Sequence, residues 1–274
     1  MEKVSCSICS SDNSDLYKEV VNRFDTSEIF HIVKCECGFI YLNPRPSISE
    51  IKSYYENKNY TPHKNSSKIY KYLQMITFRW KYNKLIKHNF NNCQLLDFGS
   101  GADDFLDYIS SMTNWKLFSH DPFIDSNYSI IDAKNDKCNI VTMWHSLEHV
   151  HDIDGAFNFI DSILEKEGIL FIAVPNIDAI EMKIFGSSWI AFDAPRHLHH
   201  FSEDSIHKIL SRNNFKILTI HTLLQDTVFN TYSSFTGNKI LAFLISLLLL
   251  PFLLLIIFLN NKYASSKLYI CSRK

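Results

Sequence analysis

The stretch that most constrains the fold of this chain runs from Leu95 to Gly101 and reads LLDFGSG. Its apolar residues suit a buried strand, and the run from Phe105 to Ile109 begins a helix behind the two glycines. A strand, a glycine turn and a helix in this order are typical of doubly wound α/β folds, which bind nucleotides at such a turn. A further acid, Asp121, follows 24 residues after Asp97 and is placed to hold ribose hydroxyls.

The residues after the glycine turn favour a cationic cofactor over a dinucleotide. Asp103 and Asp104 stand where a pyrophosphate would meet the helix N-terminus, and two carboxylates there would repel it. The same carboxylates suit a nucleoside that carries positive charge. S-adenosylmethionine carries such charge in its sulfonium and amine groups, so we predict that it is the cofactor.

Four segments of the chain share the order and spacing of the motifs of one family. They are Leu96-Asp97-Phe98-Gly99-Ser100-Gly101, His120-Asp121-Pro122, Trp144-His145-Ser146-Leu147-Glu148-His149-Val150 and Val174-Pro175-Asn176. Together they resemble a class I methyltransferase. The resemblance implies an α/β fold with a Rossmann-like, doubly wound, mostly parallel seven-stranded sheet and an antiparallel last strand.

The same resemblance implies roles in cofactor binding. Asp97 would brace the glycine turn and the methionine amine, Asp121 would take the ribose, and Asp132 would face adenine. The expected cofactor-binding residues are Asp97, Gly99, Ser100, Gly101, Asp121, Pro122, Asp132 and His145.

Apolar segments of strand length alternate with helical segments after residue 93, which argues for a mostly parallel sheet. The expected strands are Gln94–Phe98, Lys116–Ser119, Tyr128–Ile131, Asn139–Trp144, Gly168–Val174, Lys216–His221 and Ser266–Cys271. Two helices, Ser49 to Tyr60 and Ser67 to Phe90, are expected to precede and cap the fold. The predicted parts are a zinc-ribbon-like domain (1–44), a linker with capping helices (45–93), a methyltransferase domain (94–237), an apolar membrane hairpin (238–262) and the last strand of the sheet (263–274).

Four of the seven cysteines gather near the N-terminus as Cys6-x-x-Cys9 and Cys35-x-Cys37. Four thiolates match tetrahedral zinc, and a ribbon this small has no sufficient core of its own without metal. Because four protein ligands leave no open coordination position, we predict a structural zinc ion and not a catalytic one. The second pair is one residue shorter than the usual CxxC, so thiols without metal remain the alternative.

A stretch of 20 residues, Ile240 to Leu259, carries no charge, and Lys239 and Lys262 flank it. As a helix it would cover about 30 Å, which is the hydrocarbon thickness of a bilayer. A single span would separate the last strand from its neighbour in the sheet. We therefore expect a re-entrant hairpin of two half-helices that turns near Pro251 and returns to the same membrane face. A single span and a pair of buried helices are the alternatives.

Methyl transfer from a sulfonium requires the protein to position both partners and to remove one proton. Histidine is the natural base near neutral pH, and the chain clusters histidines after Trp144 and again in residues 193–201. We predict His197 as the base and His145 as the second choice. Asp193, Arg196 and His197 are expected to bind acceptor hydroxyls.

The segment Pro195-Arg196-His197-Leu198, together with the N-terminal cysteines, is similar to a subgroup of bacterial methyltransferases found with surface-polysaccharide enzymes. The similarity implies O-methylation of a sugar hydroxyl on a small-molecule or lipid-linked saccharide, at the cytoplasmic face of the cell membrane. Glu148-His149 also resembles a pair in quinone-biosynthesis O-methyltransferases, where carboxylate and imidazole could hold a divalent cation. A quinone or isoprenoid acceptor is therefore the alternative.

The charge balance gives no support for nucleic-acid binding. The chain has 28 basic and 29 acidic residues, so it lacks the positive surplus that drives such binding. An RNA-binding module would account for the ribbon but not for this balance. A non-catalytic, membrane-associated scaffold that retains cofactor would not need both Asp97 and Asp121. The first residues lack the apolar run of a secretory signal, which favours a cytoplasmic catalytic part.

Overall fold

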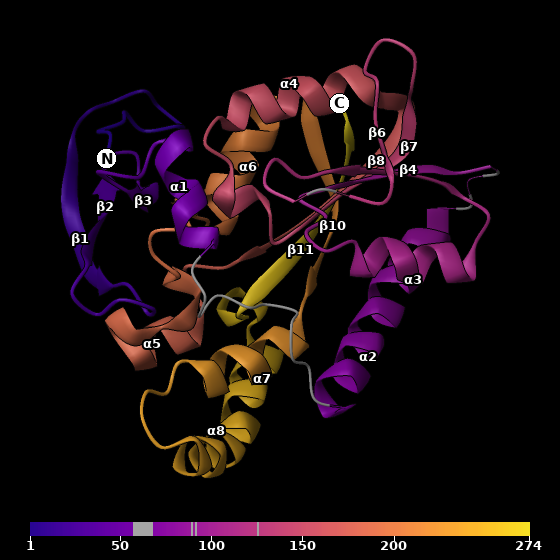
Figure 1. Ribbon diagram of the computed structural model, residues 1–274. Helices are drawn as coiled ribbons and strands as arrows, with labels where there is room; N and C mark the ends of the chain where they lie inside the picture. The colour runs from indigo at the N-terminus through magenta and orange to yellow at the C-terminus, as the bar shows by residue number, and fades with distance from the viewer. Residues whose placement is uncertain (57–67, 89, 91, 125) are drawn as a thin grey trace.

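The computed structural model describes residues 1–56, 68–88, 90, 92–124 and 126–274, and a seven-stranded sheet forms its centre (Figure 1). The strands lie in the order β10-β11-β8-β7-β4-β5-β6. Their bounds are β4 (Gln94–Phe98), β5 (Lys116–His120), β6 (Ser129–Ile130), β7 (Cys138–Trp144), β8 (Leu164–Pro175), β10 (Phe215–Thr222) and β11 (Ser266–Arg273).

The predicted sheet is confirmed, including its antiparallel last strand. β11 lies between β8 and β10 and is antiparallel to both, while β4, β5, β6, β7 and β8 pair in parallel. β6 is shorter than the strand expected at Tyr128–Ile131, and β8 begins before the expected Gly168. Five neighbouring parallel strands bring their carboxyl ends to one edge, where ligands of open α/β sheets bind.

Helices cover both faces of the sheet, so alternate strand residues face two different apolar cores. Leu95 packs with residues of α2 and α3, whereas Leu96 packs with residues of α4 and α6. Because both faces are covered, β7 and β8 carry almost continuous apolar runs. The α-helices are α1 (Ile48–Tyr55), α2 (Lys68–Leu85), α3 (Asp104–Met112), α4 (Ile153–Ile163), α5 (Ile180–Phe185), α6 (Glu203–Arg212), α7 (Leu224–Ser233) and α8 (Lys239–Leu259).

The two helices predicted before the sheet are present, with different bounds. α1 ends at Tyr55, and a short 3-10 helix, η1 (Ile86–His88), follows α2. The predicted end of the first helix at Tyr60 and the predicted start of the second at Ser67 lie outside the described residues.

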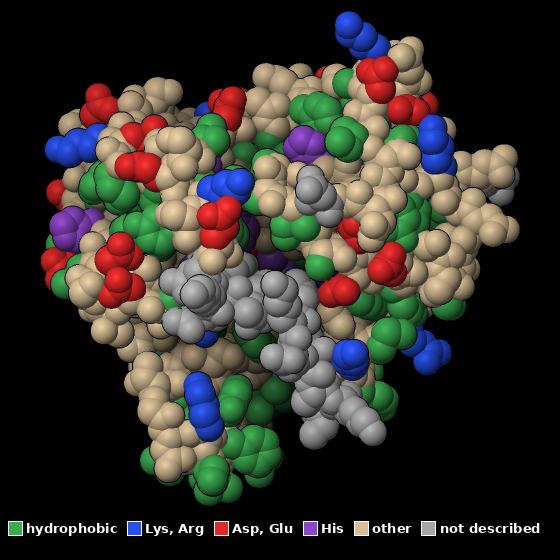
Figure 2. Space-filling model, viewed as in Figure 1, with side chains coloured by type: hydrophobic (Ala, Val, Ile, Leu, Met, Phe, Trp, Pro, Cys, Tyr) green, Lys and Arg blue, Asp and Glu red, His purple; other side chains and the backbone are tan. Residues whose placement is uncertain are grey.

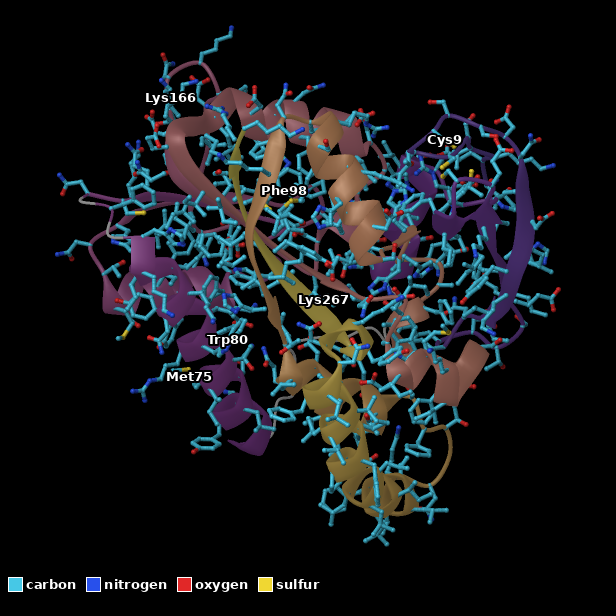
Figure 3. All side chains as sticks on the ribbon, turned by 180° about the vertical axis from the view of Figure 1, so that it is seen from behind. Cys9, Met75, Trp80, Phe98, Lys166 and Lys267 are labelled. Atoms are coloured by element: carbon cyan, nitrogen blue, oxygen red, sulfur yellow. The ribbon has the colours of Figure 1, made fainter. Side chains whose placement is uncertain are left out.

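The N-terminal residues form a second sheet that takes one strand from the methyltransferase part of the chain. Its order is β1 (Ser14–Val21), β2 (Ile29–Cys35), β3 (Ile40–Leu42) and β9 (His199–His200). The ribbon residue Phe39 also belongs to the same apolar core as Leu96. Seen from behind, Cys9 lies in this ribbon on the side of the molecule away from Trp80 of α2, with Phe98 between them (Figure 3). The ribbon is therefore packed onto the methyltransferase domain.

The apolar segment differs from the expected hairpin, because α8 is one helix of 21 residues that continues through Pro251. α8 packs against α7, and its buried residues recur along its whole length: Ala242, Ser246, Leu253 and Ile257. Both of its ends therefore lie on the protein. The prediction of two half-helices that turn at Pro251 is wrong.

The rest of the α8 surface is exposed and apolar. Leu248 and Phe258 are 71% and 87% exposed. Apolar side chains gather at the lower end of the molecule in Figure 2, where Figure 1 places α8. Within the described residues, α8 is the one helix that is long and apolar enough to cross a membrane. Of its most apolar stretch of 18 residues, 22% is buried in the protein.

Candidate active site

The glycine turn lies at the carboxyl end of β4 and requires glycine for two reasons. Gly99 has a φ of 80°, a left-handed conformation that side chains disfavour. A Cβ added to Gly99 would also lie 2.4 Å from the Cβ of Ser146, which follows β7. Gly101 has a φ of 58°, and a Cβ there would meet open space. The turn thus leaves backbone accessible next to Gly101.

Asp121 lies beside this turn, as the sequence predicts. Its Oδ2 accepts a hydrogen bond from the Gly101 N–H at 3.1 Å, and its Oδ1 accepts from the Phe123 N–H at 2.9 Å, so Pro122 lies within the same turn. Ser100 is fixed by a hydrogen bond of 2.6 Å between its Oγ and the Oγ of Ser119. These residues form a rigid acidic edge that suits a ribose diol.

Asp97 is buried at the end of β4, and its Oδ1 accepts a hydrogen bond of 2.6 Å from Thr142 Oγ1. Burial raises the pKa of this carboxyl group to about 6. The Nζ of Lys81 is 4.5 Å from the centroid of the Trp144 ring, and burial lowers the pKa of this ammonium group to about 8. Lys81, which no sequence motif predicted as a site residue, reaches the site from α2.

The three other acids near the turn are engaged in local structure. Asp103 Oδ2 accepts from the Ser126 Oγ and the Asn127 N–H, and Asp104 Oδ2 accepts from Gln74 Nε2 at 3.2 Å. Asp132 is exposed, and its Oδ1 accepts from the Lys134 N–H in its own turn. A contact between Asp132 and adenine stays a prediction.

His145 follows β7 with a φ of 55° and lies between two carboxylates. Its Nε2 is 3.0 Å from Asp226 Oδ2, and its Nδ1 is 3.4 Å from Glu148 Oε1. Burial alone would lower the pKa of His145, but these carboxylates outweigh burial and raise it to about 10. His145 is therefore an imidazolium at neutral pH, which does not suit the role of a base. Asp226 comes from α7, and no motif around it in the sequence predicted that it belongs to the site.

Glu148, His149 and His197 form a second group beside His145. Their metal-binding atoms all lie within 4.8 Å of one another. Burial would raise the pKa of Glu148, but the neighbouring imidazoles, His145 first, lower it. Burial lowers the pKa of His149 to about 4, so this imidazole is neutral. In the folded chain the predicted base, His197, therefore lies next to Glu148 and His149.

Asp193 and Arg196 bind each other. Arg196 Nε donates to Asp193 Oδ2 at 2.9 Å, a second guanidinium nitrogen binds Asp193 Oδ1, and Arg196 is 1% exposed. Arg196 also donates to the Tyr54 carbonyl. The pair holds the segment that carries His197, and a role of Asp193 and Arg196 in binding acceptor hydroxyls stays a prediction.

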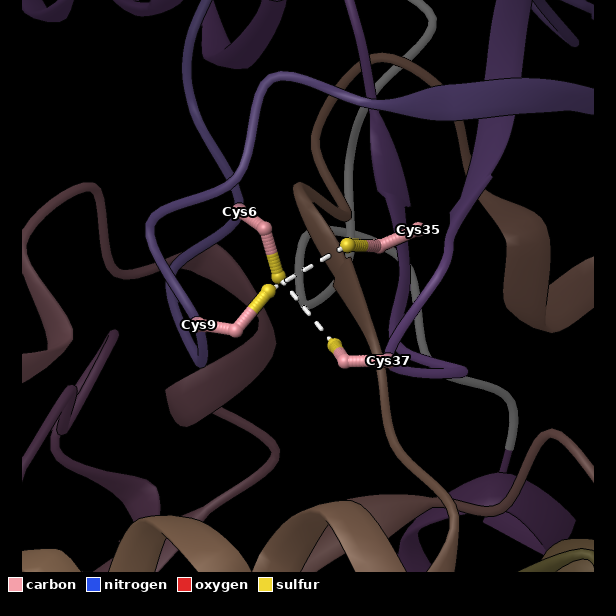
Figure 4. A group of neighbouring side chains, drawn as sticks. All are labelled: Cys6, Cys9, Cys35 and Cys37. Carbon is pink, nitrogen blue, oxygen red and sulfur yellow. Dashed lines mark hydrogen bonds between the residues drawn. The ribbon is translucent and has the colours of Figure 1, made fainter.

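The four ribbon cysteines converge as the sequence predicts (Figure 4). The Sγ atoms of Cys6 and Cys37 are 3.6 Å apart, and those of Cys9 and Cys35 are 3.4 Å apart. A tetrahedral zinc ion with Zn–S bonds of 2.3 Å would separate its sulfurs by about 3.8 Å. Gly38, with a φ of 91°, turns the chain directly after Cys37 and permits the short second pair. The donor set and its geometry therefore fit zinc.

The fold and the site together define a class I methyltransferase. The family described as "Methyltransferase domain" matches residues 70–220, and the chain belongs to this family. It is an S-adenosylmethionine-dependent methyltransferase. No curated protein sequence matches the chain.

Solved structures share the fold at low sequence identity. The [4+2]-cyclase SpnF has a TM-score of 0.52 and 13% identity, over 84% of this chain and 98% of that protein. Magnesium protoporphyrin IX methyltransferase from Synechocystis PCC 6803, determined with bound SAH, has a TM-score of 0.50 and 12% identity, over 83% of this chain and 100% of that protein. At these identities the similarity shows the fold and not the acceptor.

Proposed function

We propose that this methyltransferase methylates a sugar hydroxyl of a membrane-linked glycan intermediate at the cytoplasmic face of the cell membrane. The proposal rests above all on α7 and α8, which pack against each other. α7 carries Asp226, which contacts His145 at the carboxyl end of β7. α8 packs against α7 and exposes apolar side chains on its outer surface. These two adjacent helices would thus join the acceptor site to a lipid surface.

The side chains of His145 and Asp226 suit an acceptor that carries hydroxyls. They remain 34% and 19% exposed, so a ligand can reach them. A ring hydroxyl could donate a hydrogen bond to the Asp226 carboxylate or accept one from the His145 imidazolium. A quinone ring offers few donors, so this pair favours the sugar.

The surface of α8 suits insertion into one leaflet. One side of the helix contacts α7 and the other sides are apolar, which is the pattern expected of a helix that lies between protein and acyl chains. Lys239 and Lys262 flank the helix, and the Nζ of Lys239 is 5.8 Å from the centroid of the Tyr232 ring. Tyrosine and lysine are typical of the headgroup level of a bilayer.

We also propose that Cys6, Cys9, Cys35 and Cys37 hold one structural zinc ion. The candidate ligand atoms lie within 4.8 Å of one another, and the apolar side chains of the ribbon sheet pack in cores that it shares with the methyltransferase domain. Metal analysis of the purified protein should find about one zinc per chain from these ligands, and Cys9→Ser should reduce it.

The function is tested by methyl transfer from labelled S-adenosylmethionine to a membrane lipid extract. The label should enter a lipid-soluble product, and mild acid should release it into water as a methylated saccharide. Gly99→Ala serves as the cofactor-deficient control. Label that stays in the organic phase after acid treatment would instead identify a quinone or isoprenoid acceptor, and the sugar proposal would fail.

A further inference from the structure

We propose that α2 is a second membrane-binding element, whose outer face contacts the anionic headgroups of the bilayer. Residues 68–88, which form α2 and the 3-10 helix η1 behind it, contain no aspartate or glutamate. They contain six lysines and arginines: Lys68, Lys71, Arg79, Lys81, Lys84 and Lys87. The chain as a whole is balanced, with 28 basic and 29 acidic residues, so α2 concentrates positive charge. Such clusters on an amphipathic helix bind anionic lipids.

α2 is amphipathic, with a packed face and an outer face. Phe78 and Leu85 are buried in the apolar core that also contains residues of α3 and the sheet. Tyr72, Leu73 and Ile76 are instead 68%, 55% and 49% exposed. Ile76 lies four residues after Tyr72 and three after Leu73, so these side chains share one side of the helix, away from Phe78 and Leu85. The outer face therefore presents apolar side chains to solvent.

Basic residues continue the outer face toward the C-terminal end of the helix. Arg79 and Trp80 lie three and four residues after Ile76, and Lys84 lies four residues after Trp80. The Nζ of Lys84 is 5.1 Å from the centroid of the Trp80 ring. Within the part of the chain that the structure describes, Arg79, Lys84 and Lys87 form no ion pair. Tryptophan and lysine side by side are typical of the interface between a membrane and water.

α2 extends toward the end of the molecule that α8 occupies. Figure 3 shows Met75 and Trp80 in the lower half of the molecule, α8 at its lower end and Lys166 at the opposite end. α7, which packs against α8, also exposes Val228 and Phe229, by 45% and 56%. This placement lets α2 and α8 contact one bilayer together.

The composition of the outer face favours a bilayer over two other occupants. In a symmetric dimer formed through this face, Arg79 and Lys84 would meet the same cations of the second copy, and like charges repel. A nucleic acid would satisfy the cations but would not cover Leu73 and Ile76. An anionic bilayer satisfies both, because its headgroups pair with the cations and the adjoining acyl boundary takes up the apolar side chains.

The inference rests on the membrane location in the proposed function and not on the identity of the acceptor. α8 contributes apolar contacts, which neutral and anionic lipids support alike. α2 makes attachment depend on lipid charge, and raised salt should therefore remove the preference for anionic lipid. α2 also carries Lys81 to the cofactor site on its packed side, so the enzyme would meet the membrane one helix away from its chemistry.

The test is cosedimentation of the full-length protein with two kinds of vesicle, phosphatidylcholine alone and phosphatidylcholine mixed equally with phosphatidylglycerol. The double variant Arg79→Glu with Lys84→Glu should lose at least about 10-fold in affinity for the anionic vesicles and keep its affinity for the neutral ones. The matched control is Lys137→Glu with Lys166→Glu, which makes the same change of charge away from α2. Lys137 donates to the Ser162 carbonyl just before β8, and both control lysines are exposed. The control should bind both kinds of vesicle like the wild type.

Retained affinity for S-adenosylmethionine shows that a variant is folded, and Arg79→Gln with Lys84→Gln replaces the charge reversal should that variant misfold. Equal losses in the α2 variant and the control would show an effect of net charge alone and overturn the inference. A wild type without preference for anionic vesicles would overturn it as well.

The remaining outcomes separate this inference from the proposed function. Vesicle binding that is lost in Leu248→Glu with Phe252→Glu but unchanged in the α2 variant would assign the membrane contact to α8 alone. Binding of RNA, or a dimer, that is lost in the α2 variant while vesicle binding is unchanged would assign the outer face to that partner and overturn the bilayer. Charge-dependent vesicle binding without methylation of any saccharide would confirm the role of α2 and contradict only the proposed acceptor.

Discussion

Tyr41 of the ribbon pairs with His199, two residues beyond His197, in antiparallel register. The Leu42 N–H also donates to the Leu198 carbonyl at 2.9 Å. The fold of the ribbon therefore helps to set the position of the loop that carries His197. The ribbon thereby braces the segment that follows His197.

Loss of the proposed ribbon zinc should slow methyl transfer more than it weakens cofactor binding. Cys37→Ser removes one of the four converging thiols and should loosen β3, and with it β9. We expect a fall in kcat of at least about 10-fold, which corresponds to about 1.4 kcal/mol, and little change in the Kd for S-adenosylmethionine. Calorimetry and turnover measure the two effects. Cys93→Ala is the control, since Cys93 lies in the other apolar core, and unchanged turnover of Cys37→Ser would refute the coupling.

Gly99→Ala should weaken cofactor binding by displacing the backbone of the glycine turn. The new Cβ would lie 2.4 Å from the Cβ of Ser146, in addition to the cost of a φ of 80°. We expect the Kd for S-adenosylmethionine to rise at least about 10-fold, because a strained residue costs about 1–3 kcal/mol and the clash adds to it. Gly237→Ala is a matched control, with a φ of 93° but open space around the new Cβ. Equal affinities of the two variants would show that the contact with Ser146 is unimportant.

The cofactor half of the site could be predicted from sequence because its signals are local. Asp97, Gly99 and Asp121 stand at fixed offsets within one strand-turn-helix unit and the strand that follows it. Asp226 and Lys81 could not be found in this way, because α7 and α2 bring them to the sheet edge from distant parts of the chain. Their positions depend on tertiary packing.

The error at Pro251 and the unforeseen pair of Asp193 and Arg196 have physical causes. Proline inside a helix costs about 3 kcal/mol, which favoured a break at Pro251. The helix continues because its buried residues on both sides of the proline, Ser246 and Leu253 among them, pack in the protein. Arg196 pairs with Asp193, which lies three residues away in the same loop, and this ion pair was not predicted. Sequence spacing outside a helix does not reveal such a pair.

Cofactor binding should weaken in mild acid through Asp97. In the free protein the pKa of this buried carboxyl group is about 6, and the cofactor cation favours the ionised form. Below pH 6 binding must first remove the proton, so the Kd should rise by up to about 10-fold per pH unit and be level near pH 7. Lys81, with a pKa of about 8, stays charged in this window. Calorimetry between pH 5 and pH 7 checks the slope, and Asp97→Asn should bind weakly with no slope. A slope that persists in Asp97→Asn would assign it to another group.

Membrane binding should depend on the exposed face of α8. Leu248 and Phe252 are 71% and 67% exposed, and each buried apolar side chain of this size contributes about 1.5–3 kcal/mol. The double variant Leu248→Glu with Phe252→Glu should therefore lose at least about 100-fold in affinity for anionic phospholipid vesicles and keep its affinity for S-adenosylmethionine. Ile130→Glu is the control, because Ile130 is 80% exposed on β6 at the edge of the sheet. Cosedimentation with vesicles measures the difference. Equal binding of the double variant and the control would contradict a lipid-facing α8, and a double variant that changes from dimer to monomer would show that α8 meets a second copy of the chain instead.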